Sequence, residues 1–285
     1  MRKLFAIVFA VAALAAFAVA FTALRGAKEH KSKTTSVAGE ASAVAPGEGR
    51  RTPVVVELFT SEGCSSCPPA DALLARLERE QPVEGAEVVA LAQHVDYWND
   101  LGWADPFSSH AFSERQGEYA AVFGNDGVYT PQMIVDGRAE FPGGQSSKAF
   151  ETIAQAAREP KAEVSLARGA GETDTDDALR LSVRVVRLPK LSDGDTADVL
   201  LAVTESGLSS DIARGENAGR RLTHVGVVRA LTKIGTLNAA TPPFAADTTV
   251  ALDKSWRRET LRAVVFLQER ASRRVVGAAS LKLFG

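Results

Sequence analysis

The chain has 285 residues, 45% of them apolar, and a formal net charge of -2 at neutral pH. This length is enough for two ordinary hydrophobic cores. Because the charges are nearly balanced and no lysine- and arginine-rich block with interleaved aromatic residues occurs, we expect no nucleic-acid partner.

The N-terminus has the pattern of an export signal, since Arg2 and Lys3 precede an apolar run over residues 4–24. Ala18-Val19-Ala20 offers a cleavage site, but the run is also long enough to remain as a membrane anchor. Residues 1–24 are therefore a signal peptide or an N-terminal anchor, and residues 25–52 form a flexible linker. Either alternative predicts a periplasmic or extracellular protein, free or tethered to the inner membrane by residues 4–24, where a disulfide can persist.

The first folded segment is a short apolar run, residues 54–60, that predicts a buried strand. The only two cysteines, Cys64 and Cys67, follow it directly. Next come four apolar residues at helical spacing: Ala70, Leu73, Leu74 and Leu77. The cysteines are thus expected between a central strand and the N-terminus of a helix.

This position favours redox chemistry, because the N-terminus of a helix stabilises an anion and lowers the pKa of a thiol. We expect Cys64 to be the reactive thiolate and Cys67 the resolving thiol that closes an intramolecular disulfide. A purely structural disulfide is the first alternative, although so small a loop removes little unfolded-state entropy. Half of a structural zinc site is the second, although no other cysteine pair exists and the four histidines are scattered.

Residues 87–95 predict a second buried strand, which completes a right-handed βαβ unit. His94 and Asp96 lie at its carboxyl end, the edge where chemistry gathers in open α/β sheets. His94 is either a proton carrier or cation beside Cys64, or a structural residue satisfied by a loop carbonyl or by Asp96. Glu57, in the first strand, is either a proton acceptor for Cys67 or a structural carboxylate paired with an arginine or a backbone donor.

Further along, residues 106–123 predict a helix, and Thr130-Pro131 precedes an apolar strand that ends in an Asp136-Gly137 hairpin signal. A helix that begins at Ser146 then closes this unit, which ends at Glu159-Pro160.

Three stretches carry a resemblance to a known family. They are Leu58 to Asp71 with its CSSCPPAD motif, His94-Val95-Asp96-Tyr97-Trp98 and Tyr129-Thr130-Pro131-Gln132-Met133. With them the chain resembles an exported bacterial thioredoxin-like family of unknown function. The resemblance implies a thioredoxin fold in which Cys64 attacks, Cys67 resolves, and a cis Pro131 after Thr130 lets a substrate strand lie beside the disulfide. Gly63 and Ser65-Ser66 depart from the thioredoxin pattern, so no reduction potential is carried over.

From residue 161 onward the pattern changes to alternation of apolar and polar residues, with about seven strands predicted between turn signals. This pattern favours a β-sandwich of accessory or binding role over residues 161–285. The segment 215–229 resembles a series in the same family. It is either a turn followed by a strand, or a segment that docks against the Cys64 face or binds a client.

The sequence therefore predicts an α/β thioredoxin-like domain (residues 53–160) followed by an all-β sandwich-like domain (161–285). The expected function is thiol-disulfide exchange with protein thiols, catalysed by Cys64, Cys67, His94, Thr130 and Pro131, without an organic cofactor and with a separate redox partner. One alternative is a Cu(I)-binding or metallochaperone protein that uses Cys64, Cys67 and His94. The other is a non-catalytic binding module with a structural disulfide.

Overall fold

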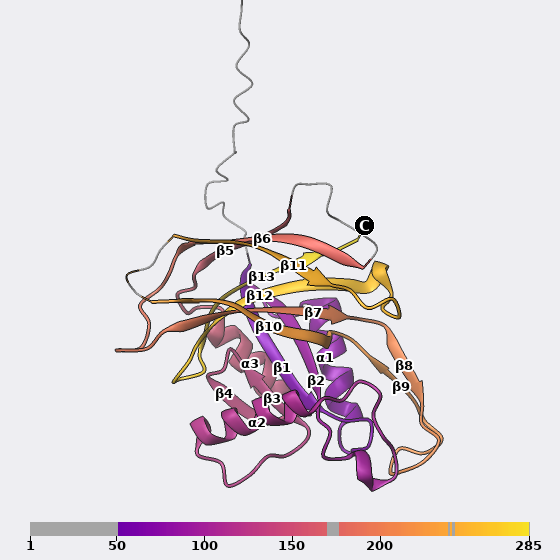
Figure 1. Ribbon diagram of the computed structural model, residues 1–285. Helices are drawn as coiled ribbons and strands as arrows, with labels where there is room; N and C mark the ends of the chain where they lie inside the picture. The colour runs from indigo at the N-terminus through magenta and orange to yellow at the C-terminus, as the bar shows by residue number, and fades with distance from the viewer. Residues whose placement is uncertain (1–50, 170–176, 239, 241–242, 285) are drawn as a thin grey trace, which may run out of the picture. The chain divides into compact units, whose positions relative to one another are not determined.

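The computed structural model describes residues 51–169, 177–238, 240 and 243–284 (Figure 1). The predicted export segment, residues 4–24, and the linker up to residue 50 lie outside the described residues. Within the described part of the chain, no helix is long and apolar enough to cross a membrane.

The N-terminal half contains the predicted βαβ unit. Its elements are β1 (Thr52–Thr60), α1 (Pro68–Glu80), β2 (Ala86–His94), the short helix η1 (Asn99–Leu101), α2 (His110–Phe123), β3 (Gln132–Val135), β4 (Ala139–Pro142) and α3 (Ser146–Ala156). Strands β1 and β2 are parallel, and their last register pair is Thr60 with His94. The buried face of α1 consists of the four apolar residues that the spacing indicates, Ala70, Leu73, Leu74 and Leu77. This part of the prediction is confirmed.

The C-terminal half is made of strands. They are β5 (Glu163–Arg168), β6 (Ala178–Arg187), β7 (Ala197–Glu205), β8 (Leu208–Asp211), β9 (Arg221–His224), β10 (Val227–Leu237), β11 (Phe244–Ala251), β12 (Leu261–Glu269) and β13 (Val275–Lys282), with the short helix η2 (Arg258–Thr260) before β12. Gly226, with a positive φ of 58°, lies between β9 and β10.

The prediction of a thioredoxin-like α/β domain followed by a separate β-sandwich is wrong. The described chain is mostly β, and one mixed sheet of eight strands runs in the order β13-β12-β7-β10-β2-β1-β3-β4. The connection is made by β10, whose Val227 pairs in parallel with Ala92 of β2, while Ala92 N donates to Gly226 O at 2.8 Å. Strands from the C-terminal half therefore extend the sheet that carries the cysteines.

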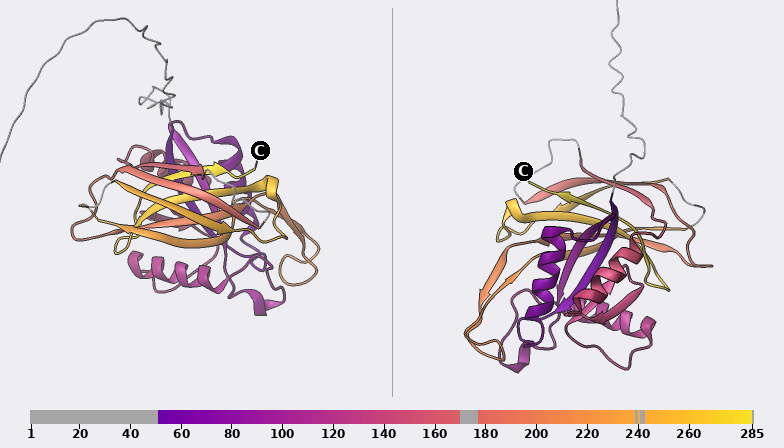
Figure 2. Two further views of the ribbon diagram at one scale, coloured as in Figure 1. Left: turned by 45° about the horizontal axis from the view of Figure 1, so that its top comes forward. Right: turned by 180° about the vertical axis from the view of Figure 1, so that it is seen from behind.

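Alternation along β1 places two cores on opposite faces of this sheet. Val54, Val56 and Leu58 pack with α1 and α3. Val55 instead belongs to a core with residues of β7, β12 and β13, such as Phe266. A third core lies between β7, β12 and β13 and the three-stranded sheet β11-β6-β5, which faces away from the helices (Figures 1 and 2). The strands β7 and β12 are thus buried on both faces.

Candidate functional site

The two cysteines form a disulfide in the loop between β1 and α1, with their Cα atoms 5.4 Å apart. Cys67 is the N-cap residue of α1, and Pro68 follows in the first helical turn. Both cysteines are fully buried, whereas Ser65 and Ser66 between them are exposed. The structure therefore buries the expected reactive residue, Cys64, as completely as Cys67.

A loop from the C-terminal half holds the cysteine segment. This covering loop, residues 212–220, joins β8 to β9 and lies beside the β1–α1 loop (Figure 1). Asn217 is buried, and its Nδ2 donates to the carbonyl oxygens of Glu62 and Cys64 at 2.9 and 3.0 Å. Glu216 Oε2 accepts a hydrogen bond of 3.0 Å from Ser65 N. Both interpretations of segment 215–229 hold, because a turn leads into the strand β9 and Asn217 in that turn contacts the Cys64 segment.

Buried charged and polar side chains gather beside the disulfide. We define the polar cluster as Glu62, Asp71, His94, Asp105 and His224. Glu62 is its centre, because its carboxylate contacts His224 Nε2 at 3.0 Å and accepts from Trp103 Nε1 at 2.8 Å. The Glu62 backbone N donates to Asp105 Oδ2 at 2.8 Å. The cluster therefore joins the residue two before Cys64 to β9 and to the loop after β2.

The two histidines of the polar cluster each have one carboxylate partner. His94 Nδ1 lies 2.7 Å from Asp105 Oδ2, and the His94 and His224 rings are 4.8 Å apart between centroids, at 83°. The remaining ring nitrogens, His94 Nε2 and His224 Nδ1, are buried and have no hydrogen-bond partner within the described residues. Each histidine thus has one buried ring nitrogen that no described residue contacts through a hydrogen bond.

The environment shifts the pKa values of this cluster. Burial opposes the charged form of His94, but the carboxylates of Asp105, Asp71 and Glu62 together raise the pKa of His94 above its ordinary value. Burial likewise opposes the charge of Asp105, but His94 and two backbone donors together lower the pKa of that carboxyl. Asp71 as a whole is partly exposed, but its carboxylate is buried. This burial raises the pKa of Asp71, although His224 and His94 lower it in part. The cluster combines proton donors and acceptors in one place.

Asp105, rather than Asp96, is the partner of His94. Strand β2 ends at His94, so the alternation that would put Asp96 on the same face does not continue. Asp96 instead accepts from Ser113 Oγ at 2.5 Å and lies 3.1 Å from His110 Nδ1.

Thr130 and Pro131 lie at the same end of the sheet as the cysteines. The register pair of Phe59 with Gln132 puts Pro131 beside the end of β1, and the bond between Thr130 and Pro131 is cis. Thr130 Oγ1 accepts a hydrogen bond of 2.8 Å from Trp98 Nε1. A Cβ on Gly143 would lie 3.2 Å from Pro131 Cβ and 3.0 Å from Ala70 Cβ, so this proline is close to the first turn of α1.

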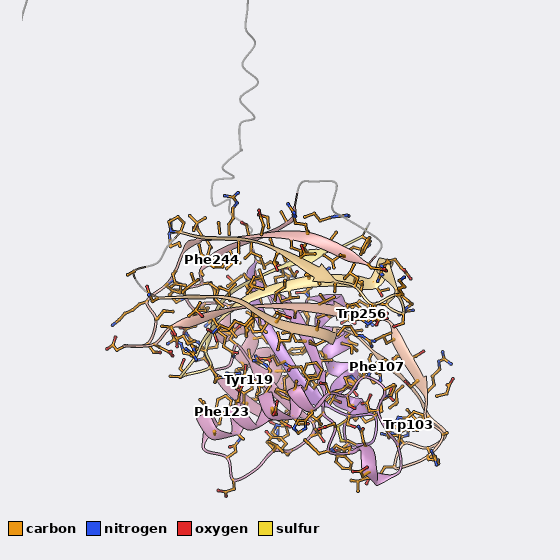
Figure 3. All side chains as sticks on the ribbon, in the orientation of Figure 1. Trp103, Phe107, Tyr119, Phe123, Phe244 and Trp256 are labelled. Atoms are coloured by element: carbon orange, nitrogen blue, oxygen red, sulfur yellow. A yellow bond between two sulfur atoms is a disulfide. The ribbon has the colours of Figure 1, made fainter. Side chains whose placement is uncertain are left out.

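Glu57 is a structural carboxylate. Arg115 Nε and Nη2 donate to its two oxygens at 2.7 and 3.0 Å, and Gln93 Nε2 donates at 2.5 Å. Tyr119, which stacks with Phe123 on α2 (Figure 3), donates to it as well. Burial would raise the pKa of Glu57, but Arg115 and these donors hold it below its ordinary value. The paired arginine was one of the two interpretations of this residue.

The sequence proposed His94 and both cysteines as candidate site residues but did not single out Glu62, Asp71, Asp105 or His224. Asp71 carried a usable signal in the sequence, since it lies one helical turn after Cys67. In the structure its backbone N–H donates to Cys67 O at 3.1 Å. Asp105 and His224 carried none, because Asp105 lies in the loop after β2 and His224 in β9, and only the tertiary structure brings them to Glu62. Within the described residues, no three His, Cys, Asp or Glu side chains form a group arranged to hold a metal ion.

The chain matches a family model over residues 55–268 and belongs to that family, described as "Protein of unknown function (DUF1223)". A solved structure of a protein from Agrobacterium tumefaciens, a structural genomics target, is 27% identical with a TM-score of 0.63, and the match covers 82% of this chain and 96% of that one. A calcium-binding mutant of β-glucuronidase 2 from Bacteroides uniformis is 14% identical with a TM-score of 0.24, over 41% of this chain and 12% of that chain. No curated protein matches the chain.

Proposed function

We propose that the protein is an exported thiol-disulfide oxidoreductase whose Cys64–Cys67 pair exchanges disulfides with protein thiols. The observation that carries the proposal is the disulfide between these cysteines directly before α1, beside a buried cluster of protonatable groups. A disulfide that closes so short a loop constrains the unfolded chain little. Stabilisation of the fold alone is therefore a weak reason for its presence.

The reaction begins with attack of a substrate thiolate on Cys64 Sγ. The Cys64–Cys67 bond breaks, a mixed disulfide forms at Cys64, and Cys67 leaves as a thiolate. A second substrate thiolate then attacks the mixed disulfide and releases Cys64, so that two electrons pass from the substrate to the cysteine pair. The reverse sequence reduces a substrate disulfide, and a redox partner restores the starting state in either direction.

We assign the attacked sulfur to Cys64 because of its surroundings. Ser65 and Ser66 next to it are exposed, and Ser66 Oγ lies 3.3 Å from Cys64 Sγ. Cys67, in contrast, leads straight into the first turn of α1. The N-terminus of α1 favours a thiolate over a thiol at the cysteine pair. His94 acts in the same direction, because its raised pKa favours the cationic form.

Exchange with a protein substrate requires the covering loop to move, because both cysteines are fully buried. The hydrogen bonds to be broken are the two from Asn217 and the one to Glu216. We infer that substrate binding displaces this loop and uncovers Cys64.

The apolar run over residues 4–24 after Arg2 and Lys3 supports export. We therefore assign the reaction to the periplasm or the extracellular space, with the protein free or held at the inner membrane by this run. A disulfide persists in these compartments, whereas the cytoplasm keeps thiols reduced.

The reduction potential of the Cys64–Cys67 pair in glutathione buffers tests the proposal. We expect a value between about -120 and -270 mV, the range of disulfide oxidoreductases. A reduced Cys67→Ser variant should accumulate a mixed disulfide with an unfolded protein substrate that contains a disulfide, because Cys64 attacks that disulfide and no resolving thiol remains, whereas Cys64→Ser should not. A potential below about -300 mV, together with no trapped substrate, would show that the disulfide is structural.

A further inference from the structure

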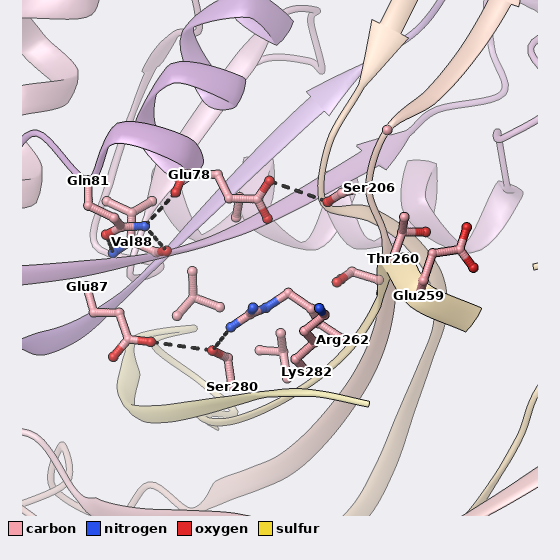
Figure 4. A pocket seen from close by; sticks show the side chains of 15 residues that line it. Glu78, Gln81, Glu87, Val88, Ser206, Glu259, Thr260, Arg262, Ser280 and Lys282 are labelled. Carbon is pink, nitrogen blue, oxygen red and sulfur yellow. Dashed lines mark hydrogen bonds between the residues drawn. The ribbon is translucent and has the colours of Figure 1, made fainter. Parts of the chain in front are cut away.

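A cavity lies where the two halves of the eight-stranded sheet separate. Strands β10 and β2 share a single register pair, Val227 with Ala92, at the carboxyl end of β2. Toward the other end of β2, residues 87–90 line a cavity of about 390 Å³ that β12, β13 and the end of α1 also border (Figure 4). This volume is at the lower end of the range for small-molecule sites.

The lining of this cavity combines a small apolar floor with charged walls. Val89, Ala90 and Val264 are buried and form the floor. Five charged residues stand among hydroxyl-bearing ones around it: Glu78, Glu87, Glu259, Arg262 and Lys282. Apolar contacts with a few convergent polar groups are typical of a ligand site.

The two cations of the cavity lie directly opposite each other. Arg262 of β12 is the register partner of Lys282 of β13, and like charges at opposite positions of an antiparallel pair are destabilising. Arg262 Nη2 donates to Ser280 Oγ at 2.7 Å, and neither cation forms a direct ion pair with a described residue, although Arg262 acts electrostatically on Glu78. An anionic group held between the two cations would relieve their repulsion.

Glu87 lies on the other side of Ser280 and Glu78 beside Ser206, whereas the third carboxylate, Glu259, lies next to Thr260 (Figure 4). Ser280 Oγ, which accepts from Arg262, donates to Glu87 Oε1 at 3.4 Å. Glu78 Oε2 accepts from Ser206 Oγ at 3.4 Å, and burial raises the pKa of Glu78 although Arg262 opposes this. A positive and a negative wall thus face the same small volume, with one hydroxyl between Arg262 and Glu87 (Figure 4).

We propose that this cavity binds a small zwitterion, a free α-amino acid or a short peptide. Its carboxylate lies between Arg262 and Lys282, its ammonium faces Glu78 and Glu87, and its side chain lies over Val89 and Val264. The site borders the C-terminal end of α1, whereas the cysteines lie at its N-terminus, so the inference does not depend on the proposed redox function.

Calorimetric titration of the oxidised wild-type protein with matched probes tests this inference. L-alanine carries both charges, propionate lacks the ammonium, and ethylamine lacks the carboxylate. L-phenylalanine with its two corresponding analogues and the dipeptide Ala-Ala complete the set, so that a free amino acid is distinguished from a peptide. We expect saturable binding of an amino acid or of Ala-Ala, at least about tenfold tighter than of either singly charged analogue, since a lost charge-assisted hydrogen bond costs that much.

Variants of the two walls complete the test. Arg262→Gln, Lys282→Gln and Glu78→Gln should each weaken binding at least about tenfold. Lys282 is exposed, so its variant remains informative if Arg262→Gln fails to fold. The control is Arg79→Gln. Arg79 is an exposed cation of α1, the helix that carries Glu78, but it does not line the cavity, so the change should leave binding unchanged. Three results would each overturn the inference. They are that no probe binds saturably up to millimolar concentration, that propionate and alanine bind with equal affinity, or that Lys282→Gln binds as the wild type does.

Discussion

Asp71 shows how burial and charge act on one residue of the site. It lies one helical turn after Cys67, and its Oδ1 accepts a hydrogen bond of 2.9 Å from Thr60 Oγ1. Burial is the largest influence and raises the pKa of Asp71 above the ordinary 3.8, although His224 and His94 lower it in part. The folded protein therefore holds a proton on Asp71 more tightly than the unfolded chain does.

We predict that Asp71→Asn is more stable than the wild type at neutral pH and that this difference shrinks as the pH falls. A raised carboxyl pKa contributes stability that is fully present below the ordinary pKa and is lost as the pH rises through the folded-state pKa. Urea unfolding of both oxidised proteins across the acid and neutral range measures the difference. Asp126→Asn, at an exposed position, is the control. A stability difference for Asp71→Asn that does not change with pH would contradict the prediction.

Among the elements, the β8–β9 hairpin connects the C-terminal half to the cysteines. Its loop is closed by Ile212 N, which donates to Arg220 O at 2.9 Å, and by Gly219 N, which donates to Ile212 O at 2.8 Å. Gly215, with φ of 80°, lies close to Trp103, since a Cβ on it would be 3.2 Å from Trp103 Cβ. The loop is therefore held in one shape while Asn217 reaches the cysteine backbone.

Asn217→Ala should speed the reduction of the disulfide by dithiothreitol. The change removes two hydrogen bonds worth about 2 kcal/mol together, so the open state should be populated roughly 30-fold more. Thiol release over time measures the rate. Arg221→Gln, which removes the exposed contact with Asp211 on the same hairpin, is the matched control. Equal rates in Asn217→Ala and Arg221→Gln would mean that the loop does not protect the disulfide.

For the whole molecule, buried polar contacts tie the first strand to the last ones. Arg115 of α2 binds Glu57 of β1 and also donates to Gln268 of β12 at 2.9 Å, while Gln268 Nε2 donates to Tyr119 at 2.7 Å. Lys161 makes a second connection, since its Nζ contacts Asp136 at 2.5 Å and the Val275 carbonyl at 3.3 Å. Both halves of the chain thus meet in one hydrogen-bonded interior.

We expect Arg115→Met to lower the free energy of unfolding by about 3–5 kcal/mol, because it leaves the Glu57 carboxylate buried without its partner. Chemical denaturation at neutral pH measures this loss. The double variant Glu57→Gln and Arg115→Met should recover most of it, since no uncompensated charge remains. If the double variant were as unstable as Arg115→Met, packing rather than charge would explain the effect.

Local patterns were sufficient to predict the elements around the cysteines. Apolar spacing predicted α1 with its four buried residues, and the run before Cys64 predicted β1. The same patterns did not predict which strands pair. Alternation in β10 and β12 indicates a strand with a buried face, but it contains no information on the partner, so the continuous sheet was missed.

The sequence by itself determined the position of the cysteine pair between a strand and a helix, because an apolar run and helical spacing are patterns that act within a few residues. Only the tertiary structure decided what surrounds that pair. Asn217 meets Cys64 across 153 residues of chain, and Glu62 meets His224 across 162. Such contacts form only because the pairing of β10 with β2 places the β8–β9 hairpin beside the cysteine segment. The periodicity of apolar residues does not predict contacts between such distant residues, because it reports only the local conformation of the chain.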